Sequence, residues 1–219
     1  NKRMKKVSDL TNWQDGINEV LVGNCLDLMK MMPDKCVDLV LTDPPYGMEF
    51  RSNYRKIKHD KIEGDDIFPV ELIAEFQRIA KRGVYVFCRW DNLRDLPPPK
   101  SVLAWVKNNW SMGDLQHEHG RQWEAICFYP QEQHQFIKRI PDVIKSNRTG
   151  NNLHPTEKPI DLMMTLLQAN VGDLIFDPFM GSWTTAKACQ DLKRNFIGAE
   201  LSEKYCEIGE KRLAQKMLF

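Results

Sequence analysis

The sequence has no long apolar run, no paired cysteines and no excess of charge of one sign. No apolar stretch approaches the roughly 20 residues that a membrane-spanning helix needs, and the basic residues 1–6 lack the apolar stretch of a secretion signal. The six cysteines contain no CxxC pair, which predicts small core residues in a reducing compartment. With a formal net charge of +1, nucleic-acid binding would need a local basic patch. A single cytoplasmic domain spanning residues 1–219 is therefore expected.

Several catalytic signatures are also missing. There is no GxGxxG loop, no Ser-His-Asp set and no evident cysteine nucleophile. His117 and His119 are the best candidates for metal ligands, but their i, i+2 spacing on an irregular segment is poor for a metal. No metal site is predicted.

Short apolar runs alternate with stretches of helical periodicity. The runs predict strands at 20–22, 37–41, 84–88, 123–129, 174–176 and 195–199. Helices are predicted at 26–32, 70–82 (ended by Gly83), 160–167 and 184–192, followed by a closing helix capped by Ser202. This alternation predicts the α/β class, with a mostly parallel sheet covered by helices on both faces. Ligands bind such sheets at the carboxyl ends of the strands.

The segment Asp43-Pro44-Pro45-Tyr46 directly follows a predicted strand. The prolines fix two φ angles and keep Asp43 extended, so the segment is a stiff arm. Its Asp43 carboxylate and Pro44 carbonyl suit the two hydrogens of an amino group on a flat heterocycle, and Tyr46 offers a stacking face. A base held this way must leave its duplex, so base flipping is implied. The alternative is a proline-rich turn with an exposed tyrosine.

A second unusual loop, residues 177–183, joins a predicted strand to a predicted helix. Gly181 permits a close backbone approach to a ligand, and a helix N-terminus favours a carboxylate. Glu200 ends the next strand, close to the spacing of about 20 residues at which an acidic side chain binds ribose hydroxyls. These features predict a nucleotide-type cofactor. A NAD enzyme and an ordinary strand-to-helix turn remain alternatives.

A third motif, Asn152-Leu153-His154-Pro155-Thr156-Glu157-Lys158-Pro159, precedes the predicted helix at 160–167. Together and in this order, the three motifs resemble the amino-methyltransferases of DNA in their permuted beta arrangement. The likeness covers about residues 19–48, 70–93 and 123–213. It implies a Rossmann-like sheet that binds S-adenosylmethionine.

The resemblance also implies a role for each matching residue. Asp43, Pro44, Pro45 and Tyr46 would form the catalytic site. The cofactor would be bound by Asn24, Cys25, Thr156, Lys158, Asp177, Phe179, Gly181, Ser182, Trp183 and Glu200. Within this set Phe179, Gly181 and Ser182 would line the methionine side, Glu200 would bind the ribose, and Thr156 and Lys158 would close over the amino-acid end. Aspartate at the head of the catalytic motif is, in this family, associated with adenine N6. The expected enzyme is a site-specific DNA adenine-N6 methyltransferase.

Two positions depart from the family pattern. The family loop usually continues Gly-Ser-Gly, whereas this chain has Gly181-Ser182-Trp183. If that position needs a positive φ, the tryptophan is strained by about 1–2 kcal/mol. Trp183 would then weaken cofactor binding or stack near the base pocket, and retained activity is the hypothesis. Asn24 replaces a common acidic residue and still offers hydrogen bonds to the cofactor's adenine edge.

A basic segment follows the catalytic arm, and Arg51, Arg55, Lys56 and Lys58 are interpreted as phosphate contacts on a flap. A solvated loop is the alternative. Small target-recognition elements are expected at about 49–66 and 91–150, which favours a short or permissive target sequence. DNA is the expected partner, and a homodimer is possible by family habit.

Other functions stay open at this point. The chain could methylate adenine in RNA, because the catalytic arm contacts only the base, or N4 of cytosine in DNA. It could also be a non-catalytic nucleic-acid-binding subunit silenced by Trp183. A NAD-dependent enzyme would leave residues 43–46 unexplained.

Overall fold

The computed structural model describes residues 4–45, 70–111, 114–150 and 157–214. These residues form an eight-stranded sheet in the order β1-β8-β7-β2-β3-β5-β4-β6. Its strands are β1 (Val20–Val22), β2 (Val37–Thr42), β3 (Ala80–Cys88), β4 (Ser101–Ser111), β5 (Arg121–Pro130), β6 (Val143–Lys145), β7 (Leu174–Asp177) and β8 (Asn195–Glu200). Five helices accompany them: α1 (Cys25–Met31), α2 (Leu72–Ile79), α3 (Ile160–Ala169), α4 (Thr184–Asp191) and α5 (Glu203–Ala214). Three short 3₁₀ turns lie at Val7–Asp9, Trp13–Gly16 and Asn92–Arg94.

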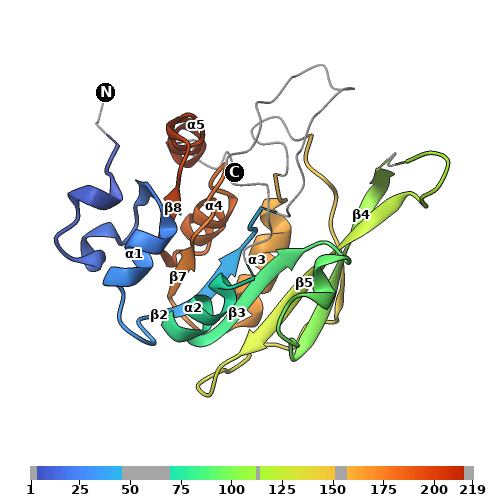
Figure 1. Ribbon diagram of the computed structural model, residues 1–219, viewed down its shortest axis with the longest axis horizontal. Coiled ribbons are helices and arrows are strands. Elements are labelled where there is room, and N and C mark those ends of the chain that lie inside the picture. The colour runs from blue at the N-terminus through green and yellow to red at the C-terminus, as the bar shows by residue number, and fades with distance from the viewer. Residues whose placement is uncertain (1–3, 46–69, 112–113, 151–156, 215–219) are drawn as a thin grey trace.

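The sheet is parallel except at β5, which runs antiparallel to both β3 and β4. Helices α1 and α2 bury one face in a core that includes Leu28 and Phe76. Helices α3, α4 and α5 bury the other face in a core that includes Leu166, Ala186 and Cys206. The expected α/β class, mostly parallel with helices on both faces, is confirmed. The β4–β5 pair extends away from the helices at one end of the sheet (Figure 1).

Two details of the predicted elements need correction. Helix α2 ends at Ile79, and Gly83 is not its terminal residue but lies within β3, paired with Leu39 and Pro130. The chain enters the strand without a loop because Ala80 is already extended and pairs with Val37. Strands β4 and β6 were not predicted, because the sequence of these segments has no clear periodicity. Every second side chain of β4 near its centre, such as Leu103 and Trp105, is nevertheless buried.

Five of the six cysteines are buried, as predicted for core residues, and Cys36 is partly buried; all six thiols are free. None of the helices within the described ranges is both long enough and apolar enough to cross a membrane.

The sheet order places a switch point between β2 and β7. From β2 the chain passes through α2 to β3 on one side, and from β7 it passes through α4 to β8 on the other. β2 and β7 are parallel neighbours, with Leu39 opposite Ile175 and Val40 opposite Phe176. Ligands bind α/β sheets outside the carboxyl ends of the strands at such a switch point. The segments that follow β2 and β7 both begin there.

Candidate active site

The ends of β2 and β7 are joined by a side-chain hydrogen bond. Thr42 Oγ1 donates to Asp177 Oδ1 at 2.8 Å, and both residues are buried. Asp43 follows Thr42 directly. The two segments singled out in the sequence therefore begin side by side at one edge of the sheet.

Asp177 is held by neutral donors. Besides Thr42, the Phe179 backbone N–H donates to Oδ1 at 3.0 Å and Thr185 Oγ1 donates to Oδ2 at 2.6 Å. Burial raises the pKa of Asp177 to about 6, although these hydrogen bonds act to lower it. The carboxyl group thus anchors the loop to α4, through Thr185, and to β2, through Thr42.

Gly181 and Glu200 are also in contact. Gly181 has a φ of 52°, in the left-handed region that favours glycine. Its N–H donates to Glu200 Oε2 at 2.8 Å, and the Ser202 N–H donates to Oε1 at 2.9 Å. Burial raises the pKa of Glu200 to about 7, opposed by these two backbone donors. A carboxylate at this strand end, braced by the glycine loop, suits a ribose diol.

The partners of Asp43 are charged. Lys158 Nζ lies 2.6 Å from Asp43 Oδ2 and 3.2 Å from Glu124 Oε2. Glu124, on β5, is also paired with Lys107, on β4. The Asp43 side chain is 16% exposed and the Lys158 side chain 4% exposed. The carboxylate is thus accessible, while the ammonium that contacts it is buried.

Arg212, on α5, connects two of the motifs and was not found in the sequence. Its Nη1 donates to Ser182 O and Oγ, both at 3.1 Å, and to Thr184 Oγ1 at 3.0 Å. Its Nη2 lies 2.9 Å from Glu157 Oε1. Burial lowers the pKa of Arg212, against the opposing effect of Glu157. One arginine near the end of the described chain therefore binds the loop after β7 to the segment before α3.

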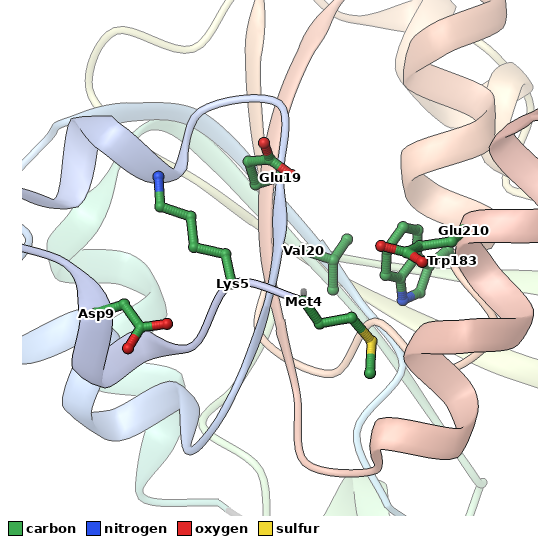
Figure 2. A pocket seen from close by; sticks show the side chains of 7 residues that line it. All are labelled: Met4, Lys5, Asp9, Glu19, Val20, Trp183 and Glu210. Carbon is green, nitrogen blue, oxygen red and sulfur yellow. The ribbon is translucent and has the colours of Figure 1, made fainter. Parts of the chain in front are cut away.

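Trp183 has a positive φ, the condition under which a tryptophan at this position was expected to be strained. Its φ is 64° and its ψ 33°, and it is the N-cap residue of α4. The indole is 5% exposed and packs on Gly209 of α5, where a Cβ would lie 2.1 Å from ring carbons Cγ and Cδ2. It also lines an open hollow of about 350 Å³ together with Met4, Val20 and Glu210 (Figure 2). The glycine in α5 makes room for the tryptophan.

The remaining predicted cofactor residues occupy three settings. Asn24 is exposed and caps α1, accepting the Leu26 N–H at 2.9 Å. Cys25 is buried within electrostatic range of Asp177, and burial raises the pKa of its thiol to about 11. Phe179 is partly buried and packs against the core on the α1 and α2 side. Cys25 and Phe179 thus lie at the same sheet edge as Asp177.

Several predicted residues lie outside the described residues: Tyr46, Arg51, Arg55, Lys56, Lys58 and Thr156. Among the described residues, no group of three or more His, Cys, Asp or Glu side chains is arranged to hold a metal ion. Three residues that contact the predicted site, Glu124, Lys107 and Arg212, carry no motif signal. Only their proximity in the fold identifies them.

Comparisons with known proteins identify a family for this chain. Residues 97–211 match the family model of the N6/N4 methyltransferases, described as DNA methylases. YubD of Escherichia coli strain K12, described as a methylase, is 29% identical across 90% of this chain and 91% of its own length. The DNA adenine methyltransferase YhdJ of the same strain is 25% identical across 96% of this chain and 87% of its own length. The solved complex of M1.HpyAVI with SAM has the same fold, with a TM-score of 0.66, 24% identity, and coverage of 89% of this chain and 98% of that one.

The chain belongs to the N6/N4 DNA methylase family. Members of this family depend on S-adenosylmethionine, and the residues present suit that group. Glu200 supplies acceptors for hydroxyl groups, and Gly181 presents a loop without a side chain between β7 and α4. The predicted cofactor and the resemblance to DNA amino-methyltransferases are confirmed.

Proposed function

We propose that this protein transfers the methyl group of S-adenosylmethionine to N6 of an adenine flipped out of DNA. The observation that carries the proposal is the Thr42–Asp177 hydrogen bond, which fixes the catalytic arm beside the glycine loop. Asp43 is thereby the first residue on one wall of a site whose opposite wall begins at Asp177. A carboxylate in this position is placed to accept a hydrogen from an amino group next to the cofactor.

Each described residue has a defined task in this mechanism. When bound, S-adenosylmethionine supplies a methyl group activated by its sulfonium. Asp43 accepts one amine hydrogen and the Pro44 carbonyl accepts the other, which directs the nitrogen lone pair toward the methyl carbon. Glu200 holds the ribose hydroxyls, and Gly181 allows the backbone to approach the methionine part. Asp43 also offers the nitrogen an acceptor for the proton that it loses once the new bond has formed.

The DNA-binding part of the proposal rests on the sequence. Tyr46 would stack on the extruded base, and the basic segment carrying Arg51, Arg55, Lys56 and Lys58 would contact phosphates. The recognised sequence is expected to be short, because the sequence leaves only small elements, at about 49–66 and 91–150, for target recognition. Sequencing of methylated sites would contradict this by revealing a long recognition motif.

Adenine is preferred over cytosine for two reasons. The catalytic motif begins with aspartate, and the relative YhdJ is named a DNA adenine methyltransferase. A cytosine-N4-specific enzyme, the PvuII DNA methyltransferase, shares the fold, with a TM-score of 0.67 and 14% identity across 92% of this chain and 88% of that one. The fold therefore accommodates either base, and the identity of the methylated nucleoside distinguishes the two assignments.

The test is incubation with labelled S-adenosylmethionine and unmethylated DNA, followed by nucleoside mass spectrometry. The expected product is N6-methyldeoxyadenosine, formed by the natural protein and not by Asp43→Ala. N4-methyldeoxycytidine would overturn the base assignment. A matched RNA oligonucleotide is expected to compete poorly, and preferential methylation of the RNA would overturn the DNA assignment.

A further inference from the structure

We propose that Lys158 is a positioning residue, which holds the Asp43 carboxylate ionised and oriented toward the target amine while Glu124 and Lys107 balance its charge. This inference rests on the proposed function and adds to it a control on the catalytic carboxylate. The four side chains come from four separate parts of the fold: the end of β2, the segment before α3, β5 and β4.

The geometry makes Lys158 the link between two carboxylates. Its Nζ lies 2.6 Å from Asp43 Oδ2, a short charge-assisted contact, and 3.2 Å from Glu124 Oε2. Because the lysine side chain is 4% exposed, water competes little for its ammonium. The contact fixes one Asp43 oxygen and with it the plane of the carboxylate.

The surroundings strengthen these interactions. The ammonium of Lys158 lies 5.2 Å from the ring centre of Phe87 and 5.9 Å from that of Trp105. Both rings are buried, and the Trp105 indole N–H donates to Ser146 O at 2.9 Å, which holds that ring in place. Coulomb interactions are stronger beside apolar walls than in water, and an unbalanced charge there is costly.

The two carboxylates and two ammonium groups of this network balance in charge. Burial would raise the pKa of Glu124, but Lys158 and Lys107 outweigh it and lower that pKa to about 2. Burial would lower the pKa of Lys158, but Asp43 and Glu124 outweigh it and raise it. Burial does lower the pKa of Lys107, which Glu124 offsets only in part. Two carboxylates and two ammonium groups therefore stabilise one another.

Other ionisable groups face the same network. Asp177, at the end of β7, and Cys88, at the end of β3, lie within electrostatic range of Asp43. Arg148 lies within range of Lys107. A negative Asp177 would disfavour an ionised Asp43, and Lys158 counters that effect. The hydrogen bond with Cys127 and burial raise the pKa of Cys88 far above its ordinary value, so this thiol stays neutral.

This role differs from the one that the sequence suggested for Lys158, a contact with the amino-acid end of the cofactor. The two roles predict different results in a double-mutant cycle. If Lys158 acts through Asp43, then Lys158→Met lowers kcat strongly in the natural protein and by no more than about twofold in an Asp43→Asn background. If it contacts the cofactor, the loss persists in that background as a weaker cofactor affinity, measured by calorimetry. The second result would overturn the proposal.

A direct test that needs no turnover is the titration of Asp43 by carboxyl ¹³C NMR, assigned with Asp43→Asn. Lys158→Met is expected to raise the midpoint of Asp43 by about 1–3 pH units. Lys107→Met is expected to raise it by less, because that ammonium acts from beyond Glu124. Glu124→Gln is expected to lower it, because Lys158 then serves Asp43 alone. A purely structural role of Lys158 would not shift the titration midpoint of Asp43 in opposite directions among these variants.

The outcomes separate this inference from the proposed function. The positioning role stands, whichever base is methylated, if the titration midpoint of Asp43 is highest in Lys158→Met, lower in Lys107→Met, lower again in the natural protein and lowest in Glu124→Gln. If Asp43 titrates alike in all four proteins, the role is overturned even when N6-methyldeoxyadenosine is formed. If Lys158→Met does not fold, the opposite shifts of Lys107→Met and Glu124→Gln decide the matter alone. With methyl transfer established, the acid limb of the kcat/KM profile is expected to follow the same order.

Discussion

The sheet contains two neighbouring strand ends that each continue into an Asp-Pro pair, Asp43-Pro44 after β2 and Asp177-Pro178 at the end of β7. The two aspartates have opposite environments. Asp43 is partly exposed and paired with a buried ammonium. Asp177 is 3% exposed and receives hydrogen bonds from two hydroxyls and one backbone N–H.

The difference lies in the partners that the fold supplies. Lys158 gives Asp43 a buried ammonium as its partner. Burial raises the pKa of Asp177 to about 6 although its neutral donors act to lower it, and its oxygens hold the chain. The same dipeptide therefore provides the proposed catalytic carboxylate after β2 and an anchor at the end of β7. Thr42 couples them, because it precedes one aspartate and donates to the other.

The largest effect is expected at Asp43. Replacing it with asparagine keeps the size of the side chain but exchanges an acceptor oxygen for a donor that faces the target amine and Lys158. Methyl transfer is expected to fall by about 10²–10³-fold, measured with labelled cofactor under single-turnover conditions. Cofactor affinity and melting temperature serve as controls. Unchanged turnover would remove the functional contrast between the two strand ends.

The next effect concerns the loop that Asp177 anchors. Gly209→Ala is expected to destabilise the protein by about 1–3 kcal/mol, because the new methyl group collides with the Trp183 indole. In a Trp183→Gly background the same change is expected to stabilise by about 1 kcal/mol, through the helix propensity of alanine. Denaturant unfolding of the four proteins measures the reversal.

Trp183→Gly alone removes strain worth about 1–2 kcal/mol but loses a buried indole worth about 3–5 kcal/mol, so a net loss of stability is expected. Its cofactor affinity is expected to match that of the natural protein, because the indole packs on α5. Binding more than about tenfold tighter would show that the tryptophan handicaps the site.

A loss of stability of similar size is expected when the anchor itself is altered. Asp177→Ala leaves the hydroxyls of Thr42 and Thr185 and the Phe179 N–H without their acceptor, which costs about 1–3 kcal/mol in the free energy of unfolding. Thr185→Val is the milder matched change. If Asp177→Ala instead left stability intact while abolishing transfer, the anchor would have to be reassigned as a catalytic group.

The smallest effect is a pH dependence at Glu200. Its pKa of about 7 in the folded protein exceeds the ordinary 4.5, so the folded state binds the proton more tightly. This group therefore adds stability to the unliganded protein as the pH falls from 7 toward 4.5, and that gain is lost as the pH rises again. Cofactor affinity is expected to change in the opposite direction, weakening by up to about tenfold per pH unit below 7. Calorimetry across this range, with Glu200→Gln as the pH-insensitive control, measures it.

Much of the fold could be predicted because it depends on local patterns. The apolar runs near β1, β2, β7 and β8 and the 3.6-residue periodicity of α3 are properties of short segments, and the structure confirms them. The predicted end of α2 was wrong because Ala80 and Gly83 pair with β2, and this pairing overrides the helix-stop signal of a glycine. Strand β4 was missed because only its centre is buried: Leu103 and Trp105 are buried, whereas Val102 and Trp110 are exposed.

The amino-acid sequence alone determined the class of protein, the order of its three motifs and the role proposed for Asp43, because those depend on which residues follow which. Tertiary structure decided the rest. Only folding brings Lys158 to Asp43 and Glu124, pairs Glu124 with Lys107, and places Thr42 against Asp177. It also opens α5 at Gly209 for Trp183. These are contacts between segments far apart in the chain, and their energies depend on burial and distance, which no linear pattern records.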